Sequence, residues 1–328
     1  MTSEKKDGYP GIFLSATDAN LPSWFTDDFR KYSKFQQMGG GGNGVLHAAY
    51  DGNLGRRVAI KRLAPSAAND EKERRRLLRE ARVTAQLQHP NTVPVYEIGK
   101  DDDGQIYFTM KKIEGENLFR ILGRIAQDDM ETLKAYPLDR LLGILIQACN
   151  ALAYAHALGV IHRDVKPENI MVGLFGEVLL MDWGVAKVWG MPNEDGDDES
   201  GPRAAGYQRL TTTGQRPGTP LYMSPEQVLG NKHVDERTDI FSMGVVLYEL
   251  LAQREPFRGP TIKDTFDNIV NETPPPPSQV TRSRTVPKRL DAICLKAMEK
   301  LPRDRYQSVQ SMIYDIRGFR NDAMQANF

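Results

Sequence analysis

Hydrophobic and polar residues alternate along the first third of the chain in a way that predicts a small sheet. From residue 29 to about residue 61, short segments place apolar and polar side chains in turn, and Gly- and Asn-rich turns separate them. Residues 70–88 instead repeat apolar positions at helical spacing, with Arg and Glu on the opposite face. The predicted strands are residues 45–50, 57–61, 92–98 and 105–111. The chain therefore begins with a small sheet and one helix.

The pattern becomes helical after Gly115. Residues 138–158 and 240–252 are apolar nearly all round, so both are expected to be buried helices, and residues 290–320 show helical spacing. A polar stretch without any period, residues 190–218, lies between the two apolar helices, and a stretch of that length is either functional or disordered. This order of elements predicts the α+β class, with two lobes and a ligand-binding cleft between them.

Composition and charge narrow the classes of protein to which this chain can belong. Hydrophobic residues make up 40% and charged residues 26% of the 328 residues, which excludes disorder throughout, collagen and a coiled coil. The 43 basic and 43 acidic residues cancel, so no overall field favours nucleic acid or an anionic membrane. Two cysteines make no disulfide framework, and no apolar run is long enough for a membrane span. We therefore expect a cytoplasmic protein.

A glycine-rich segment, residues 38–46, carries glycines at each position of G-x-G-x-x-G, namely Gly39, Gly41 and Gly44. Glycine lets backbone amides approach phosphate oxygens because no Cβ stands in the way. A strand rather than a helix is predicted after the segment, which argues against a dinucleotide-binding fold and against a P-loop. By itself the motif leaves two interpretations open, a phosphate-binding loop and a flexible turn.

Two charged residues follow the glycine-rich segment. Lys61 ends a predicted strand, and Glu80 is adjacent in helical phase to the apolar stripe of the helix that follows. If this helix packs on the sheet, the Glu80 carboxylate could reach the Lys61 ammonium and hold it toward phosphate rather than solvent. The alternatives are a surface lysine at the end of an edge strand and an ordinary solvated glutamate.

Residues 162–169 place four polar side chains at fixed offsets between apolar stretches. Asp164 can accept a hydroxyl proton, Lys166 can stabilise a transferring phosphoryl group, and Asn169 offers a neutral oxygen to a metal ion. Asp182 follows a short apolar strand, and its carboxylate suits a hard divalent ion such as Mg²⁺. The alternative is that both loops use Asp and Asn only to form turns, and the fixed spacing argues against it.

These motifs together resemble one known family. The motifs that join the glycine-rich segment are Val-Ala-Ile-Lys at 58–61, His-Arg-Asp-Val-Lys-Pro-Glu-Asn at 162–169, Met-Asp-Trp-Gly at 181–184 and Gly-Thr-Pro-Leu-Tyr-Met-Ser-Pro-Glu at 218–226. Over about residues 32 to 320 the chain resembles the eukaryotic-type (Hanks-type) protein kinases, and in texture their bacterial Ser/Thr branch. Trp183 stands where the family usually has Phe, and Thr84 stands where many relatives have an apolar residue.

The resemblance implies a two-lobed organisation. A small N-terminal lobe with a β-sheet and one helix is expected over residues 29–112, and a larger, mainly helical lobe over residues 113–320. Residues 182–226 would be the activation segment of the larger lobe. The remaining segments would be an irregular flank, residues 1–28, and a C-terminal tail, residues 321–328.

The resemblance also implies a function and its residues: transfer of the ATP γ-phosphoryl group to Ser and Thr hydroxyls of protein substrates, with Mg²⁺. The catalytic residues would be Asp164, Lys166, Lys61 and Glu80, with Lys61 paired to Glu80. The nucleotide would contact Met38, Gly39, Gly40, Gly41, Gly42, Asn43, Gly44, Leu46, Ala59, Lys61, Met110, Ile113 and Met171. The metal would be bound by Asn169 and Asp182.

Architecture and control follow from the same resemblance. Glu226 would pair with Arg305, and Asp239 would support the loop that carries the catalytic base. Thr211 and Thr213 are candidate sites of autophosphorylation that would order the activation segment. The alternative for these two residues is a polar loop that merely contains threonines.

Several alternatives stay open at this point. A pseudokinase that binds nucleotide and acts as a scaffold would keep the fold without the reaction, and a small-molecule kinase of related fold would lack the 218–226 segment and Asp239, which are both here. The resemblance leaves open a homodimer formed through the small lobe. It also leaves open that the chain is the cytosolic part of a longer, membrane-anchored kinase.

Overall fold

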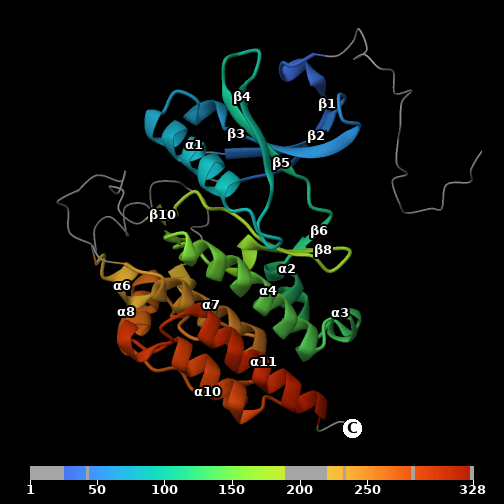
Figure 1. The fold of residues 1–328 in the computed structure, drawn as a ribbon. Coiled ribbons are helices and arrows are strands. Elements are labelled where there is room, and N and C mark those ends of the chain that lie inside the picture. The colour runs from blue at the N-terminus through green and yellow to red at the C-terminus, as the bar shows by residue number, and fades with distance from the viewer. Residues whose placement is uncertain (1–25, 42–43, 189–219, 232–233, 282–284, 326–328) are drawn as a thin grey trace, which may run out of the picture. The chain divides into compact units, whose positions relative to one another are not determined.

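The computed structural model describes residues 26–41, 44–188, 220–231, 234–281 and 285–325. The chain divides into two compact units (Figure 1). The first combines the residues up to Leu77 with Val95–Lys112, and the second combines Leu78–Pro94 with the chain from Ile113 onward. The first unit holds a five-stranded sheet and the second is mainly helical, which confirms the α+β fold expected from the sequence.

The sheet of the first unit is antiparallel, with the strand order β1-β2-β3-β5-β4. The elements of this unit are η1 (Phe29–Lys31), β1 (Tyr32–Gly41), β2 (Gly44–Asp51), β3 (Arg56–Leu63), η2 (Pro65–Ala67), the start of α1 (Glu71–Gln86), β4 (Val95–Lys100) and β5 (Ile106–Lys111). All four predicted strands are present as β2 to β5. β4 begins three residues later than predicted, because Pro94 has no N–H to donate to a strand ladder.

Alternation does not predict β1. Its sequence, Tyr-Ser-Lys-Phe-Gln-Gln-Met-Gly-Gly-Gly, has no regular period. Its pairing with β2 shifts between Ser33 and Gln36 and again between Gln37 and Gly39, and Lys34 adopts a left-handed backbone with φ 52°. Irregularities of this kind add residues to a strand and interrupt its period of two. β1 is therefore an edge strand that exists through its pairing with β2.

The two faces of this sheet carry different residues. Ile60 and Tyr107 belong to a buried cluster on one face, here called the outer face, and Phe29 of η1 packs against that cluster. Ala59 is adjacent to Ile60 on β3 and pairs with Met110 of β5. Because side chains alternate along a strand, Ala59 and Met110 lie on the opposite face, here called the inner face.

The second unit is built mainly from helices. Its elements after α1 are β6 (Gly115–Asn117), α2 (Leu118–Ala126), α3 (Met130–Ala135), α4 (Leu138–Ala157), β7 (Val160–Ile161), η3 (Pro167–Asn169), β8 (Ile170–Gly173), β9 (Val178–Leu180), β10 (Lys187–Val188), η4 (Pro220–Tyr222), α6 (Pro225–Val228), α7 (Arg237–Ala252), α8 (Ile262–Asn271), α9 (Pro277–Val280), α10 (Lys288–Ala297), η5 (Pro302–Asp304) and α11 (Val309–Gln325). The two buried helices predicted from the sequence are α4 and α7.

The core of the second unit lies around α4 and α7. Every residue of α7 from Thr238 to Ala252 is buried, and α4 buries half of its residues. α4 contacts α7 and α11, and α7 also contacts α10 (Figure 1). The helical spacing near the C-terminus forms two helices, α10 and α11, because Pro302 starts the intervening η5 turn. Within the described ranges, no helix is both long and apolar enough to cross a bilayer.

Candidate active site

Three of the predicted site residues converge in the loop that follows β7. Lys166 Nζ donates to Asp164 Oδ2 at 2.7 Å. Asn169 Nδ2 lies 3.2 Å from the same Oδ2 atom and 2.8 Å from the backbone oxygen of Asp164. The η3 turn returns the chain toward Asp164, and Pro167 favours such a turn at its first position. The fixed spacing in the sequence therefore becomes a single cluster around the Asp164 carboxylate.

Electrostatics in this cluster keep the lysine protonated. Burial opposes the positive charge of Lys166, but the nearby carboxylates raise the Lys166 pKa above its ordinary value. Asp164 has the largest effect of these, followed by Asp182 and Glu168. Burial also raises the pKa of Glu168. Lys166 is thus a cation at physiological pH, which its predicted role beside a phosphoryl group requires.

Asp239 of α7 supports the loop that carries Asp164, as the resemblance implies. Its Oδ1 accepts from Arg163 N at 2.8 Å, and its Oδ2 accepts from His162 N at 2.9 Å and from His156 Nε2 at 2.8 Å. Arg163 adopts a left-handed backbone with φ 65°, which costs a non-glycine residue about 1–3 kcal/mol. Burial opposes ionisation of Asp239, but the hydrogen bond and charge of His156 lower its pKa. The buried carboxylate therefore holds a strained loop in one conformation.

His162 and Trp183 form a buried pair next to this loop. Their ring centroids are 4.5 Å apart. His162 Nδ1 accepts from Asp164 N at 3.2 Å, and its Nε2 donates to Met181 O at 2.9 Å, so a neutral ring satisfies both nitrogens. The Trp183 indole N–H lies 3.4 Å from Leu180 O. The core thus accommodates Trp183 where the family usually has Phe.

Asp182 and Glu80 approach the same glycine within the second unit. A Cβ placed on Gly184 would lie 3.3 Å from Asp182 Oδ1 and 3.3 Å from Glu80 Oε2. Asp182 adopts a left-handed backbone with φ 62°, and Glu80 is buried in α1. The Thr84 hydroxyl, one turn further along α1, donates to Glu80 O at 2.6 Å. The two carboxylates leave little room for any side chain at position 184.

The donor atoms of Asn169 and Asp182 suit a Mg²⁺ ion held by few protein ligands. Both Nδ2 hydrogen bonds of Asn169 go to Asp164, which leaves Asn169 Oδ1 as the acceptor of that amide. Met181 N donates to Asn169 O at 2.8 Å, so the chain brings Asp182 close to Asn169. Across the ranges that the structure describes, no group of three or more His, Cys, Asp or Glu could hold a metal. A Mg²⁺ ion commonly takes one or two protein ligands and obtains the others from phosphate and water.

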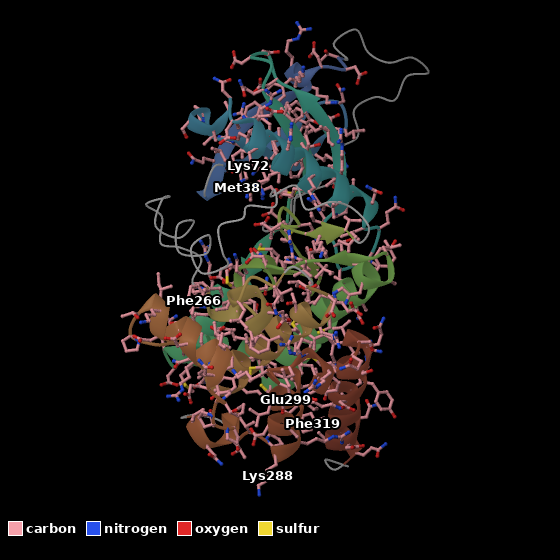
Figure 2. The ribbon with its side chains drawn as sticks, turned by 90° about the vertical axis from the view of Figure 1, so that its left-hand side faces the viewer. Met38, Lys72, Phe266, Lys288, Glu299 and Phe319 are labelled. Atoms are coloured by element: carbon pink, nitrogen blue, oxygen red, sulfur yellow. The ribbon has the colours of Figure 1, made fainter. Side chains whose placement is uncertain are left out.

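The nucleotide-binding residues predicted in the first unit lie on its sheet. They are Met38, Gly39, Gly40 and Gly41 on β1, Gly44 and Leu46 on β2, Ala59 and Lys61 on β3, and Met110 on β5. The register pairs Leu46 with Lys61 and Ala59 with Met110, so these four residues share the inner face. Met38, labelled in Figure 2, is 44% exposed. The sheet therefore gathers side chains that lie far apart in the sequence.

The remaining predicted residues lie elsewhere. Ile113 is buried in the second unit, and Met171 lies on β8 of the same unit. Lys61 and Glu80 belong to different units, so their pairing stays a prediction. Four predicted residues lie outside the described part of the chain: Gly42, Asn43, Thr211 and Thr213.

A hollow beside Asp164 has walls that the sequence analysis does not predict. Tyr222 and Ser242 line it together with Asp164 and Lys166. Ser242 Oγ donates to Tyr222 O at 2.6 Å, and the Tyr222 hydroxyl donates to Glu249 Oε2 at 2.6 Å. Burial raises the pKa of Glu249 to about 8. Tyr222 belongs to the 218–226 motif, but no local pattern places it beside Ser242, because only the fold of the second unit brings both residues to the loop that carries Asp164.

The expected pair of Glu226 and Arg305 is confirmed. Arg305 Nη1 donates to Glu226 Oε1 at 2.7 Å and Nη2 donates to Oε2 at 2.8 Å, and the Thr238 hydroxyl donates to Oε1 at 2.8 Å. The Arg305 side chain is 0% exposed and that of Glu226 is 7% exposed. Burial opposes ionisation of Glu226, but Arg305 outweighs it and lowers the Glu226 pKa. This pair fastens the end of the 218–226 segment to the helical core.

Comparisons with known proteins agree with this arrangement. The family model described as "Protein kinase domain" matches residues 32–314. The chain is 36% identical over 293 residues to Serine/threonine-protein kinase PknD of Protochlamydia amoebophila, and the match covers 88% of this chain and 30% of that protein. It is 35% identical over 289 residues to the protein of the same name from Chlamydia pneumoniae, with 87% of this chain and 31% of that protein covered.

A third relative has the same proportions. The Serine/threonine-protein kinase PknD of Chlamydia trachomatis serovar L2b is 36% identical over 294 residues, which covers 86% of this chain and 31% of that protein. The chain therefore spans about three tenths of the length of these curated relatives.

Proposed function

Since this chain belongs to the protein kinase domain family, we propose that it is an ATP-dependent protein serine/threonine kinase. It transfers the γ-phosphoryl group of ATP to Ser and Thr hydroxyls of protein substrates. One observation carries the proposal: Lys166 Nζ and Asn169 Nδ2 both lie within hydrogen-bond distance of Asp164 Oδ2. A cation, an amide and a carboxylate are thus assembled at one point of a supported loop.

Asp164 orients the acceptor and takes its proton. Its carboxylate borders the hollow lined by Tyr222 and Ser242, where an incoming hydroxyl can reach it. The Asp239 hydrogen bonds to the backbone of residues 162 and 163 hold the loop, so Asp164 keeps its position without reorganising. A positioned carboxylate of this kind acts as the general base.

Lys166 provides positive charge next to the transferring group. Its ammonium is held by Asp164, and the neighbouring carboxylates raise its pKa, so it stays protonated throughout the physiological range. A fixed cation stabilises the negative charge of the phosphoryl group in the transition state without moving during the reaction.

Asn169 and Asp182 would hold the metal. Mg²⁺ bound by them supplies charge neutralisation to the phosphate oxygens of the nucleotide. The two hydrogen bonds from Asn169 Nδ2 to Asp164 aim the amide so that its oxygen faces away from that contact. Asp182 adopts a left-handed backbone. Because Gly184 has no side chain, the Asp182 carboxylate has room beside the Glu80 carboxylate.

The first unit would bind the nucleotide. The glycines at the end of β1 let backbone amides approach phosphate, and Ala59 and Met110 on the inner face offer an apolar surface to the adenine. Lys61 lies on the same face, where it would contact the phosphates and pair with Glu80. Gly42, Asn43, Ile113 and Met171 keep the nucleotide-binding roles implied by the family.

Control by autophosphorylation belongs to the same proposal. Phosphate on Thr211 or Thr213 would add a charge of about −1.5 to −2. Arg163 is the cation expected to receive it, and its Nε donates to Val185 O at 2.6 Å, at the start of the activation segment. Phosphopeptide mass spectrometry of active protein tests this; absence of phosphate from residues 209–216 would contradict it.

We also place the kinase in the cytoplasm. Cys149 and Cys294 are both buried free thiols, as a reducing compartment allows. Fractionation of the source cells with an antibody to this chain measures the location, and recovery outside the cytoplasmic and membrane fractions would contradict it.

The decisive experiment compares phosphate transfer by the wild type and by Asp164→Asn. With γ-labelled ATP, Mg²⁺ and a set of general protein substrates, the wild type is expected to label Ser and Thr, and Asp164→Asn is expected to lose about 10²- to 10⁴-fold in rate. Asp103→Asn, an exposed carboxylate in the turn before β5, is the matched control and should keep the full rate.

A binding measurement separates the kinase from a scaffold that only binds nucleotide. The wild type and Asp164→Asn should both bind an ATP analogue, because Asp164 is assigned to the acceptor. Nucleotide binding by the wild type without any transfer, under conditions that saturate ATP and Mg²⁺, would overturn the proposed activity and favour the scaffold.

A further inference from the structure

Glu97 of β4 collects three hydrogen bonds within the first unit. Lys31 Nζ donates to its Oε2 at 2.6 Å, and the hydroxyls of Tyr32 and Tyr107 donate to its Oε1 at 2.7 and 2.9 Å. Both tyrosines are buried, and the Lys31 side chain is only 10% exposed. Burial opposes ionisation of Glu97, but its three donors outweigh it and lower the Glu97 pKa. These four residues are here called the Glu97 network.

The Glu97 network connects the two edges of the sheet. Tyr32 opens β1 at one edge, and Glu97 lies on β4 at the other edge (Figure 1). Three strands, β2, β3 and β5, lie between them in the order of the sheet. Backbone ladders join only neighbouring strands, so a direct link between β1 and β4 must come from side chains.

Both linked strands have irregular ladders. The register of β4 against β5 shifts between Val95 and Glu97, and the register of β1 against β2 shifts twice between Ser33 and Gly39. A shift of this kind leaves a residue unpaired and locally disrupts the ladder of backbone hydrogen bonds. Glu97 lies at the shift in β4, and Tyr32 lies directly before the segment of β1 that contains its two shifts. The network therefore adds a side-chain link at the places where the backbone ladders are interrupted.

The packing around the Glu97 network leaves room for the Tyr107 ring and surrounds both tyrosines with apolar contacts. A Cβ on Gly99 would lie 2.6 Å from the Tyr107 hydroxyl oxygen, so glycine at this position lets the Tyr107 ring cross β4 toward Glu97. The Phe29 ring centroid lies 4.9 Å from that of Tyr107 and 5.8 Å from that of Tyr32. The η1 turn directly before β1 is thus packed into this unit.

We propose that Lys31, Tyr32, Tyr107 and Glu97 are positioning residues, which tie β1 to β4 and β5 and so hold the glycine-rich end of β1 in register. The tie also fixes β5, whose inner-face residue Met110 pairs with Ala59. This inference deepens the proposed function, because the far end of β1 and Met110 are the parts assigned to the nucleotide. Its first test does not depend on that assignment.

The first test is amide hydrogen exchange on the chain without nucleotide. Tyr32→Phe keeps the buried ring and removes one hydrogen bond to a carboxylate, so exchange over residues 33–41 and 95–100 is expected to rise about tenfold. Exchange in α4 and α7 should not change. Tyr96→Phe is the matched control. Tyr96 directly precedes Glu97 on β4, and its exposed hydroxyl makes no hydrogen bond to the described residues.

A second pair of variants tests the charge. Lys31→Met should raise exchange over the same two segments, and Lys31→Arg should restore the wild-type pattern, because it keeps a cation within reach of Glu97. Unchanged exchange in both segments, or an equal rise across the whole sheet, would overturn the tie and leave the network as ordinary packing.

The nucleotide measurement follows on the same variants. Tyr32→Phe is expected to raise the KM for ATP about three- to tenfold while kcat changes less than twofold, because the tie positions the nucleotide and not the acceptor. A fall in kcat at unchanged KM would overturn the positioning role. If the wild type does not transfer phosphate at all, the proposed function fails, and the exchange experiment still decides the tie.

Discussion

Removal of the Glu226 charge tests how much the buried pair of Glu226 and Arg305 stabilises the second unit. Glu226→Gln keeps the size of the side chain but removes the carboxylate that the Arg305 guanidinium, which is 0% exposed, is paired with. Arg305 keeps its three backbone acceptors, Glu299 O at 2.7 Å, Arg237 O at 2.9 Å and Lys300 O at 3.0 Å. These acceptors compensate only in part, because a carbonyl carries no full charge.

The expected loss follows from the burial and the geometry. Breaking a buried ion pair by removing one partner costs about 3–5 kcal/mol. The two parallel hydrogen bonds between Arg305 and Glu226 put this pair within that range. For a unit of this size the loss corresponds to a fall in Tm of about 2–4 °C per kcal/mol. The double variant Glu226→Gln/Arg305→Met removes both charges and should lose less than the sum of the single variants.

Denaturant unfolding followed by fluorescence and by circular dichroism measures these losses. The coupling energy from the double-mutant cycle is expected to be about 2–3 kcal/mol, and Glu131→Gln on exposed α3 should change stability by less than about 0.5 kcal/mol. Because Arg305 lowers the Glu226 pKa, the stabilisation is complete above the ordinary value of 4.5 and is lost as pH falls through the lowered pKa. Losses that add within about 0.5 kcal/mol would refute the reasoning.

Three further predictions concern the site and its surroundings. Asp239→Asn should lower the rate of phosphoryl transfer at least tenfold. His162 N and Arg163 N donate to different Asp239 oxygens, and in Asn one of these oxygens is replaced by an NH₂ group that cannot accept. An unchanged kcat would show that the loop keeps its conformation without Asp239. Glu249→Gln should remove a pH dependence of stability. Because the Glu249 pKa is raised from 4.5 to about 8, the free energy of unfolding of the wild type falls by up to about 1.4 kcal/mol per pH unit as pH rises between these values. Urea titrations of both proteins at pH 5 and 9 measure the difference. Gly184→Ala should weaken Mg²⁺-dependent activity severalfold, because its Cβ would crowd two carboxylates, and an unchanged Mg²⁺ titration would contradict this.

Local patterns in the amino-acid sequence determine much of this protein by themselves. Period-two alternation predicts β2 and β3, and two strand-like segments after the first helix predict β4 and β5. The nearly uniform apolar content of residues 138–158 and 240–252 predicts α4 and α7, because burial selects side chains by their position along an element. The cluster of Asp164, Lys166 and Asn169 is also predictable, since a tight turn brings residues only five positions apart into contact.

The tertiary structure decides the contacts that hold these local pieces in place. Asp239 meets His162 N over 77 residues, Arg305 meets Glu226 over 79, and Lys31 meets Glu97 over 66. For the first two the family resemblance suggests the partners, but nothing in the local sequence does. β1 and the contact between Tyr222 and Ser242 also escape sequence patterns. These contacts form between residues far apart in the sequence, because a buried polar group needs a hydrogen-bond partner and only the folded chain determines which group that is.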